Sequence, residues 1–240
     1  MENLGQDRFM AALEATWPAA EVVRRDGWHL RRGAGGGNRV SAATALGGGD
    51  VALAEAAMRS WGQTPLFQVE LGQEALDQDL ATRGYTIHEP VVFYAAPASQ
   101  VAGEADLTAA GYLAEMRLQI MEEIWVGGSV PAPRFAIMDR VALSKRFLMG
   151  RAEDRPCGAA FVAIDGDTAM IHAIEVQPAM RRKGVGRMLL QTAARFTVAE
   201  GAHWLALAVT EQNPARALYE GLGMEEGGRY HYRILKEDGA

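Results

Sequence analysis

The sequence predicts an α/β protein built from two units of similar pattern. Strand-like and helix-like segments alternate along most of the chain. One apolar run, Ala169–Val176, is nearly continuous, which is typical of a central strand covered on both faces. In addition, each half ends in the same order: a strand, a short loop, a helix, a glycine turn and a strand.

The bulk composition narrows the class of protein. The chain has 240 residues, 49% of them hydrophobic and 22% charged, which suits a soluble globular protein of one large or two smaller domains. Its formal net charge of −6 gives no support for non-specific nucleic-acid binding. No apolar run approaches the roughly 20 residues that cross a bilayer, and the first residues lack the features of a secretory signal. We therefore expect a cytoplasmic protein with no nucleic-acid or membrane partner, either a monomer or a homodimer.

Cysteine usage bears on cross-links and metals. Cys157 is the single cysteine, so the chain has no internal disulfide framework. The sequence also has no spaced set of Cys and His residues for structural zinc, and we expect no metal.

The first unit is expected over residues 1–97. Glycine-rich turns separate its elements, and a stretch of small residues at 95–103 is expected to be a linker. Its expected helices are 7–16, 51–61 and 74–82, and its expected strands are 28–30, 40–46, 66–70 and 91–95.

The second unit is expected over residues 104–240. A hairpin turn at 165–167 precedes the central strand, and the helix after that strand carries one apolar stripe and ends at Gly201. Its expected helices are 118–125, 134–143, 185–200 and one starting at Pro214, and its expected strands are 146–152, 159–164, 169–176, 205–209 and 229–235.

The two halves can be aligned on a glycine turn. Placing Gly84 on Gly223 brings Leu80 onto Tyr219. Because residue identity is low, the repeat rests on pattern, and a chance match of two αβ segments stays open.

The segment after the central strand has the features of an anion site. The strand ends at Val176, and three cations, two glycines and an amphipathic helix follow. Glycines allow close backbone approach to a phosphate, and a helix N-terminus offers free N–H groups and partial positive charge. The alternative is a solvated basic loop. The residues expected to bind the anion are Arg181, Arg182, Lys183, Gly184, Val185, Gly186 and Arg187.

The residues of this loop do not match two common phosphate-binding motifs. A dinucleotide fingerprint needs a third glycine where Leu189 stands. A P-loop needs Lys-Ser/Thr after its last glycine, but Gly186 is followed by Arg187 and Met188.

The segment resembles the Arg/Gln-x-x-Gly-x-Gly loop of the GNAT superfamily of acetyl-CoA-dependent N-acetyltransferases. The second signature of that superfamily is matched by the stretch from Asn213 through Tyr219 to Gly223 and Met224. The resemblance covers about 50 residues, from Ile174 to Met224. It implies a GNAT-like mixed central sheet flanked by helices, in a tandem of a degenerate N-terminal unit and a complete C-terminal unit.

The resemblance also implies roles for individual residues. Tyr219 would protonate the departing thiolate, and Asn213 would contact the pantetheine arm. Backbone groups of Ile174, Glu175 and Val176 would pair with pantetheine and polarise the thioester. The alternatives are a core aromatic for Tyr219 and a purely capping role for Asn213.

Glu175 and His172 are the two candidates for the base that accepts the proton of the amine. Strict strand alternation puts them on opposite faces, but the superfamily usually has a bulge in this strand that would change the parity. The alternatives are a hydrogen-bonded core histidine for His172 and, for Glu175, an acid directed toward the loop cations.

In the N-terminal half, Asp50 stands where the other half has cations and Leu80 stands at the tyrosine position, so this half is expected to be inactive.

The resulting hypothesis is that the protein transfers an acetyl group from acetyl-CoA to a primary amine of unknown identity. The acceptor pocket is expected at 118–140, with Trp125 forming part of its wall. A non-catalytic acyl-CoA-binding sensor or interaction module is the alternative, and a nucleotide-binding protein is a third reading.

Overall fold

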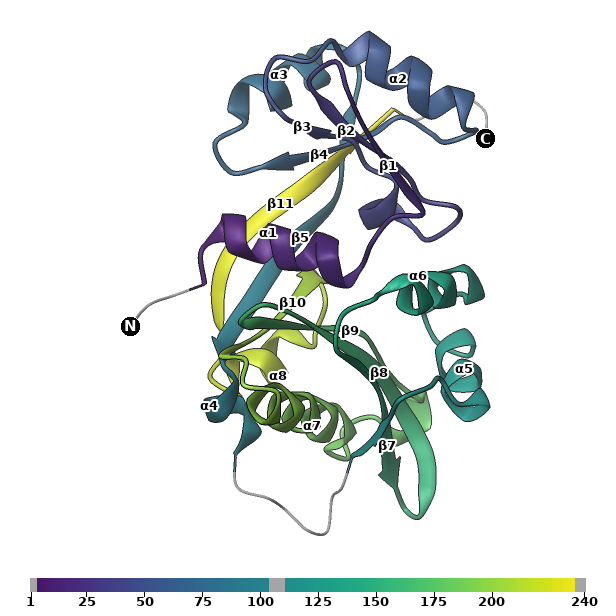
Figure 1. Ribbon diagram of the computed structural model, residues 1–240, viewed down its shortest axis with the longest axis vertical. Helices are drawn as coiled ribbons and strands as arrows, with labels where there is room; N and C mark the ends of the chain where they lie inside the picture. Colours follow the sequence, from purple (N-terminus) through teal and green to yellow (C-terminus); the bar gives the residue numbers. More distant parts are fainter. Residues whose placement is uncertain (1–3, 104–110, 236–240) are drawn as a thin grey trace. The chain divides into compact units, whose positions relative to one another are not determined.

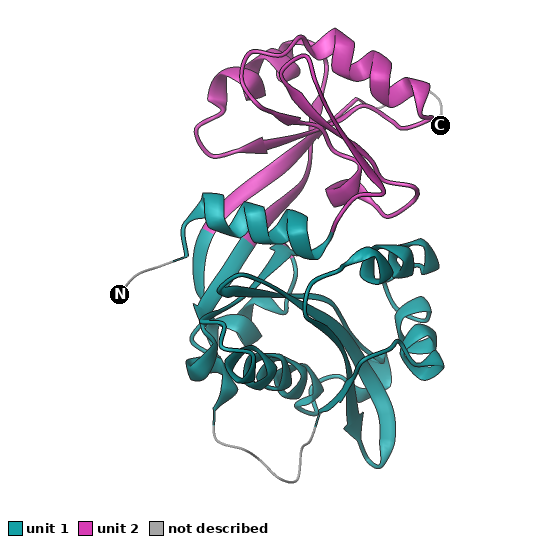
Figure 2. Cartoon of the chain, in the orientation of Figure 1, with its two compact units in different colours: residues 1–17, 93–209, 213–227 teal, residues 18–92, 210–212, 228–240 magenta. Residues whose placement is uncertain are grey.

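The computed structural model describes residues 4–103 and 111–235 and has a mixed α/β fold (Figure 1). The chain forms two compact units (Figure 2). Unit 1 combines the N-terminal segment up to Trp17 with Phe93–Val209 and Asn213–Gly227, and unit 2 combines Pro18–Val92, Thr210–Gln212 and the segment from Gly228. The units are therefore interleaved along the chain, whereas the expected domains, 1–97 and 104–240, are consecutive. The expected start at residue 104 lies outside the described residues.

Unit 1 is built around a mixed sheet. Its strands lie in the order β5, β10, β9, β8, β7, β6. Neighbours from β6 to β9 pair antiparallel, and β10 pairs parallel to β9. The strand bounds are Thr86–Pro97 for β5, Tyr112–Ala114 for β6, Lys145–Ala152 for β7, Arg155–Asp165 for β8, Thr168–Val176 for β9 and Trp204–Thr210 for β10.

Helices cover both faces of this sheet. A Cβ on Gly158 would lie 2.6 Å from Val185 at the start of α7, whereas the ring of Phe161 faces Trp17, which follows α1. Because these two strand residues are an odd number apart, α7 and α1 lie on opposite faces. The helices are α1 (Gln6–Thr16), α4 (Ala98–Ala102), α5 (Gln119–Val126), α6 (Phe135–Arg140), α7 (Val185–Ala199) and α8 (Arg216–Glu220), with short 3₁₀ turns η2 (Ala132–Arg134) and η3 (Pro178–Met180).

The prediction of a linker at 95–103 is wrong. Residues up to Pro97 belong to β5, and helix α4 follows directly. The small side chains of this stretch fit a packed position, since Ala95, Ala96, Ala98 and Val101 are all buried. Small residues can mark a tight interior as well as a flexible connection.

Unit 2 contains the pairing of β4 (Leu66–Glu70) with β11 (Glu225–Ile234), which is antiparallel. A separate three-stranded sheet consists of β1 (Glu21–Arg25), β2 (Trp28–Arg32) and β3 (Thr44–Ala45). Helices α2 (Val51–Ser60) and α3 (Glu74–Thr82) complete the unit. Its core is formed by buried apolar side chains that include Trp28, Met58, Phe67, Leu80 and Tyr85.

The strand expected at 40–46 is much shorter in the structure. A 3₁₀ turn, η1 (Asn38–Val40), begins the stretch, and only β3 is extended. The Ser41 hydroxyl donates to the Gly37 carbonyl, and the Ala42 N–H donates to the Asn38 carbonyl. These local hydrogen bonds favour a turn over a strand ladder.

The glycine turns that align the two halves have the same hydrogen-bond pattern. The Tyr85 N–H donates to the Leu80 carbonyl, and the Met224 N–H donates to the Tyr219 carbonyl. Gly84 and Gly223 both have φ in the left-handed region, at 89° and 77°. These matched turns agree with the proposed alignment, and the tandem repeat itself stays a prediction.

Candidate functional site

A bulge in β9 sets the directions of the two candidate bases. Phe161 of β8 pairs with His172, and Ala159 pairs with Glu175, so two steps on β8 oppose three on β9. Ala173 has a φ of 50°, and its carbonyl accepts a 2.8 Å hydrogen bond from the Trp125 indole. The extra residue brings both candidate bases to the same face, because paired residues on adjacent strands share a face. Strict alternation, with opposite faces, is therefore wrong here.

The ladder between β9 and β10 ends early. Three pairs are formed, from Trp204 with Thr168 to Ala206 with Met170, although both strands continue beyond them. Beyond Met170 the two strands no longer form a ladder, so backbone groups on this edge of β9 become available to a ligand that lies along it.

The predicted anion loop leads directly from β9 into α7. Gly184 precedes the helix with a φ of 82°, a conformation that favours glycine. The first helical hydrogen bond runs from the Met188 N–H to the Gly184 carbonyl. The N–H groups of Val185, Gly186 and Arg187 come before it, which is the arrangement of a helix N-terminus that can bind an anion.

The four cations of this loop differ in their surroundings. Arg181 contacts the Glu175 carboxylate at 3.2 Å and also donates to the Val176 carbonyl. Lys183 pairs with Glu153 at 2.6 Å. Arg182 and Arg187 are exposed to solvent. The loop therefore presents three exposed guanidinium groups near the start of α7, and one of them, Arg181, already contacts Glu175.

Glu175 lies at the end of β9 and is buried. One carboxylate oxygen accepts hydrogen bonds from the Ser129 N–H at 2.9 Å and from its hydroxyl at 2.8 Å, and the other accepts from Arg181. A Cβ on Gly128 would lie 2.3 Å from the Glu175 carboxyl carbon, so a larger residue there would displace the carboxylate from this position. The Gly127-Gly128-Ser129 run is the one sequence signal that could have pointed to this contact.

His172 is also buried, with Nε2 at 2.9 Å from the Thr16 hydroxyl and Trp17 packed against its ring. The Thr16 hydroxyl has one hydrogen, and it donates this to the Ala12 carbonyl at 2.6 Å. Thr16 can therefore only accept from the imidazole, which assigns the proton of the neutral ring to Nε2 and the lone pair to Nδ1. Thr16 and Trp17 come from the far end of the chain, and sequence reasoning missed them.

Tyr219 is buried in α8, and its surroundings keep the phenol protonated. Burial, and then the neighbouring Tyr94, raise its pKa to about 12. Tyr94 lies 5.7 Å away between ring centroids, and its hydroxyl donates to Glu220 and accepts from Arg216. The contact with Tyr94 was not predicted.

Asn213 is exposed and lies in the turn ahead of α8, whose N-cap residue is Ala215 and not Asn213. Its side-chain oxygen accepts from the Ala215 N–H at 2.9 Å. Helix α8 begins at Arg216, two residues later than the expected start at Pro214. Ile174 and Val176 flank Glu175 on the strand, as the sequence order requires.

The described part of the chain also bears on metals and membranes. Over residues 4–103 and 111–235, no group of three or more His, Cys, Asp or Glu side chains is arranged to hold a metal ion. Within the same residues, none of the helices combines the length and the apolar character needed to cross a membrane.

Part of the chain that contains this site matches a known protein family. The family model described as "Acetyltransferase (GNAT) family" matches residues 115–224. The chain carries a GNAT acetyltransferase domain. The GNAT range includes every residue of the candidate site named from the sequence, from His172 to Tyr219. No sequence among the curated proteins matches the chain.

Several solved structures resemble this chain in fold over more than residues 115–224. A GCN5-related N-acetyltransferase from Kribbella flavida matches with a TM-score of 0.76 and 15% identity over 98% of each chain. A GCN5-related N-acetyltransferase from Sphaerobacter thermophilus matches with a TM-score of 0.60 and 17% identity, over 76% of this chain and 65% of its own. A tandem GNAT protein from the clavulanic acid biosynthesis pathway matches with a TM-score of 0.54 and 15% identity, over 78% of this chain and 69% of its own. At these identities the likeness concerns the fold alone, and the predicted GNAT-like mixed sheet flanked by helices is confirmed.

Proposed function

We propose that the protein transfers the acetyl group of acetyl-CoA directly to a primary amine. The observation that supports this best is the continuous path from the open edge of β9 through the glycine loop to the start of α7. A thioester along the strand edge and a pyrophosphate at the helix N-terminus would then belong to one extended ligand. GNAT membership supports acetyl-CoA as that ligand.

In the proposed reaction the neutral amine attacks the thioester carbonyl, the C–N bond forms and the C–S bond breaks. The proton of the amine goes to a base, and the CoA thiolate takes a proton from Tyr219. A phenol with a pKa near 12 stays protonated at neutral pH and can therefore serve as this donor.

Of the two candidate bases, we propose His172. The neutral imidazole has its lone pair on Nδ1, because Nε2 donates to Thr16. Glu175 already accepts three hydrogen bonds, and protonation would disrupt at least one of them. Glu175 fits better as the residue that holds Arg181 and Ser129 in position.

The test is an acetyl-CoA consumption assay over a library of amines, with Tyr219→Phe as the variant. We expect kcat to fall about 100-fold or more for any amine that the wild type acetylates, because the variant lacks the proton donor. The matched control is Tyr112→Phe, which removes the hydroxyl of an exposed tyrosine in β6. A Tyr219→Phe protein with full kcat would refute the acid role.

The same assay distinguishes the proposed transferase from the non-catalytic alternative. A protein that binds acetyl-CoA tightly, yet turns over no amine in the library, would be an acyl-CoA-binding sensor or interaction module.

A further inference from the structure

Helix α1 places one polar side chain against the strand that carries His172. The buried residues of α1 are Phe9, Ala12, Leu13 and Thr16, and their spacing puts them on one face of the helix. Phe9, Ala12 and Leu13 are apolar, whereas Thr16 brings a hydroxyl into this packed face and has no exposed surface. A buried hydroxyl needs hydrogen-bond partners, and Thr16 has the Ala12 carbonyl and the His172 imidazole.

The helix sets the direction of this hydroxyl. Its hydrogen is bonded to the Ala12 carbonyl, one turn back in α1, so only the oxygen lone pairs face Nε2 of His172 at 2.9 Å. If the neutral imidazole carried its proton on Nδ1, the lone pair of Nε2 would face those of Thr16, or the hydroxyl would have to leave Ala12. Either change breaks a buried hydrogen bond. The contact therefore selects the tautomer that has its proton on Nε2.

Aromatic rings hold the imidazole in the orientation that makes this contact. The ring of Trp17, the residue that follows α1, lies 4.9 Å from the His172 ring between centroids. Phe161, the pairing partner of His172 on β8, lies 6.2 Å away and nearly parallel, at 29°. Because packed rings turn with difficulty, Nε2 stays directed at Thr16.

We propose that Thr16 is a positioning residue for the transfer reaction: its hydroxyl keeps the proton of His172 on Nε2 and so makes Nδ1 the basic nitrogen. This inference rests on the proposed function, in which His172 accepts the proton of the amine. When that proton reaches Nδ1, the imidazolium still donates from Nε2 to Thr16, so the contact persists through the proton transfer. Thr16 acts through His172.

The first measurement is ¹H–¹⁵N NMR of the histidine side chains in the full chain without substrates, at about pH 8, where an ordinary imidazole is neutral. A spectrum of His172→Asn identifies the His172 signals. We expect the wild type to show a protonated Nε2 and an unprotonated Nδ1. Thr16→Val keeps the shape but lacks the hydroxyl, so we expect a mixture of tautomers, whereas Thr16→Ser keeps the hydroxyl and should retain the wild-type pattern.

The second measurement is steady-state kinetics with any amine that the wild type acetylates. We expect Thr16→Val to lower kcat about tenfold, because part of the enzyme then holds its base in the wrong tautomer, while KM for acetyl-CoA changes much less. Thr16→Ser should restore kcat to within about twofold of the wild type.

The matched control is Thr197→Val. The Thr197 hydroxyl is also buried and also donates to a carbonyl of its own helix, that of Ala193 in α7 at 2.8 Å. This variant loses the same kind of hydrogen bond away from His172, so it should keep both the tautomer and kcat even if its melting temperature falls.

The proposal would be overturned by a wild-type His172 with its proton on Nδ1, by a Thr16→Val protein that keeps either the wild-type tautomer or full kcat, or by an equal loss of kcat in Thr197→Val. The spectra need no substrate. If no amine is acetylated, the proposed function fails while the spectra still decide whether Thr16 sets the tautomer. An active enzyme with the other tautomer refutes this inference alone.

Discussion

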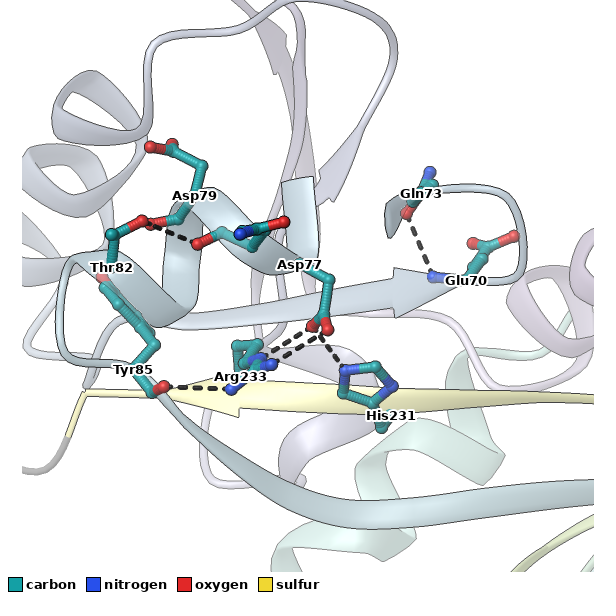
Figure 3. A network of polar contacts seen from close by, with 9 residues as sticks. Glu70, Gln73, Asp77, Asp79, Thr82, Tyr85, His231 and Arg233 are labelled. Carbon is teal, nitrogen blue, oxygen red and sulfur yellow. Dashed lines mark hydrogen bonds and ion pairs between the residues drawn. The ribbon is translucent and has the colours of Figure 1, made fainter. Parts of the chain in front are cut away.

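The carboxylate of Asp77 joins α3 to β11 through two side chains at once (Figure 3). Its hydrogen bond from Arg233, and then that from His231, lower its pKa from 3.8 to about 2, and burial opposes this shift. Because the pKa in the folded state lies below the unfolded value, the stabilisation is fully present above about pH 4. It is lost as the pH falls from about 4 to about 2.

We therefore predict that Asp77→Asn lowers the free energy of unfolding by about 1 kcal/mol at pH 7, a value reduced for solvent screening of a carboxylate that is 28% exposed. The difference from wild type should shrink between about pH 4 and pH 2, because protonated aspartic acid also fails to pair with Arg233. Urea unfolding at several pH values measures this. Asp79→Asn is the control, with no comparable loss expected from its exposed ion pair with Arg83. A loss that stays constant down to pH 2 would argue against the ion pair as its cause.

The sequence allowed the candidate site residues to be predicted, but not the residues from distant parts of the chain that contact them. His172, Glu175 and Tyr219 stand in recognisable local patterns. The contacts from Thr16, Ser129 and Tyr94 depend on how distant segments fold together, and no local spacing signals them. The bulge at Ala173 was implied by the GNAT resemblance, whereas strict alternation gave the wrong faces, since one extra residue in a strand changes the face of all that follow.

At the scale of elements, the path from β9 to α7 was predictable in detail because several local signals agree. Pro178 stops a strand, a glycine with positive φ precedes a helix, and an apolar stripe continues through it. β4 and α3 have the bounds predicted for them. Helix α4 and β1 were missed because each is five residues long and lacks such agreement.

The loop's exposed cations lead to a prediction about ligand binding. We expect the double variant Arg182→Gln and Arg187→Gln to raise KM for acetyl-CoA about tenfold while kcat changes much less, because both cations would contact phosphate rather than the reacting atoms. Steady-state kinetics at two salt concentrations measures this, and the salt dependence of KM should weaken in the variant.

Arg155→Gln, which removes an exposed cation at the start of β8, is the matched control. An unchanged KM in the double variant would refute the assignment of the loop as the pyrophosphate site.

At the scale of the whole molecule, each unit is assembled from separate parts of the chain. In unit 1, Phe9 of α1 stacks on Phe93 of β5 at 3.8 Å, and α1 packs on β8 and on β9, the strand that carries both candidate bases. Sequence patterns follow the chain in order, so they divided it into consecutive domains. Which segments return to a unit is decided by long-range packing, which those patterns do not encode.

We predict that a truncated chain of residues 104–240 does not fold. It lacks α1, α4 and the part of β5 that belongs to unit 1, and so leaves the face that Phe9 and Trp17 cover exposed to water. Each large apolar side chain contributes about 2 kcal/mol by burial, so losing several removes most of a typical stability of about 5–15 kcal/mol. Thermal unfolding followed by circular dichroism should give a cooperative transition for the full chain and none for the truncated one. A cooperative transition in the truncated chain would show that α1 and β5 are dispensable.

The pairing of β4 with β11 has a consequence for biosynthesis. Glu70 is synthesised well before its partner Tyr230, because most of the chain lies between them. Until β11 has been made, the nascent chain holds β4 without this neighbour, as an open edge to which other chains can add. β11 closes that edge when it pairs with β4.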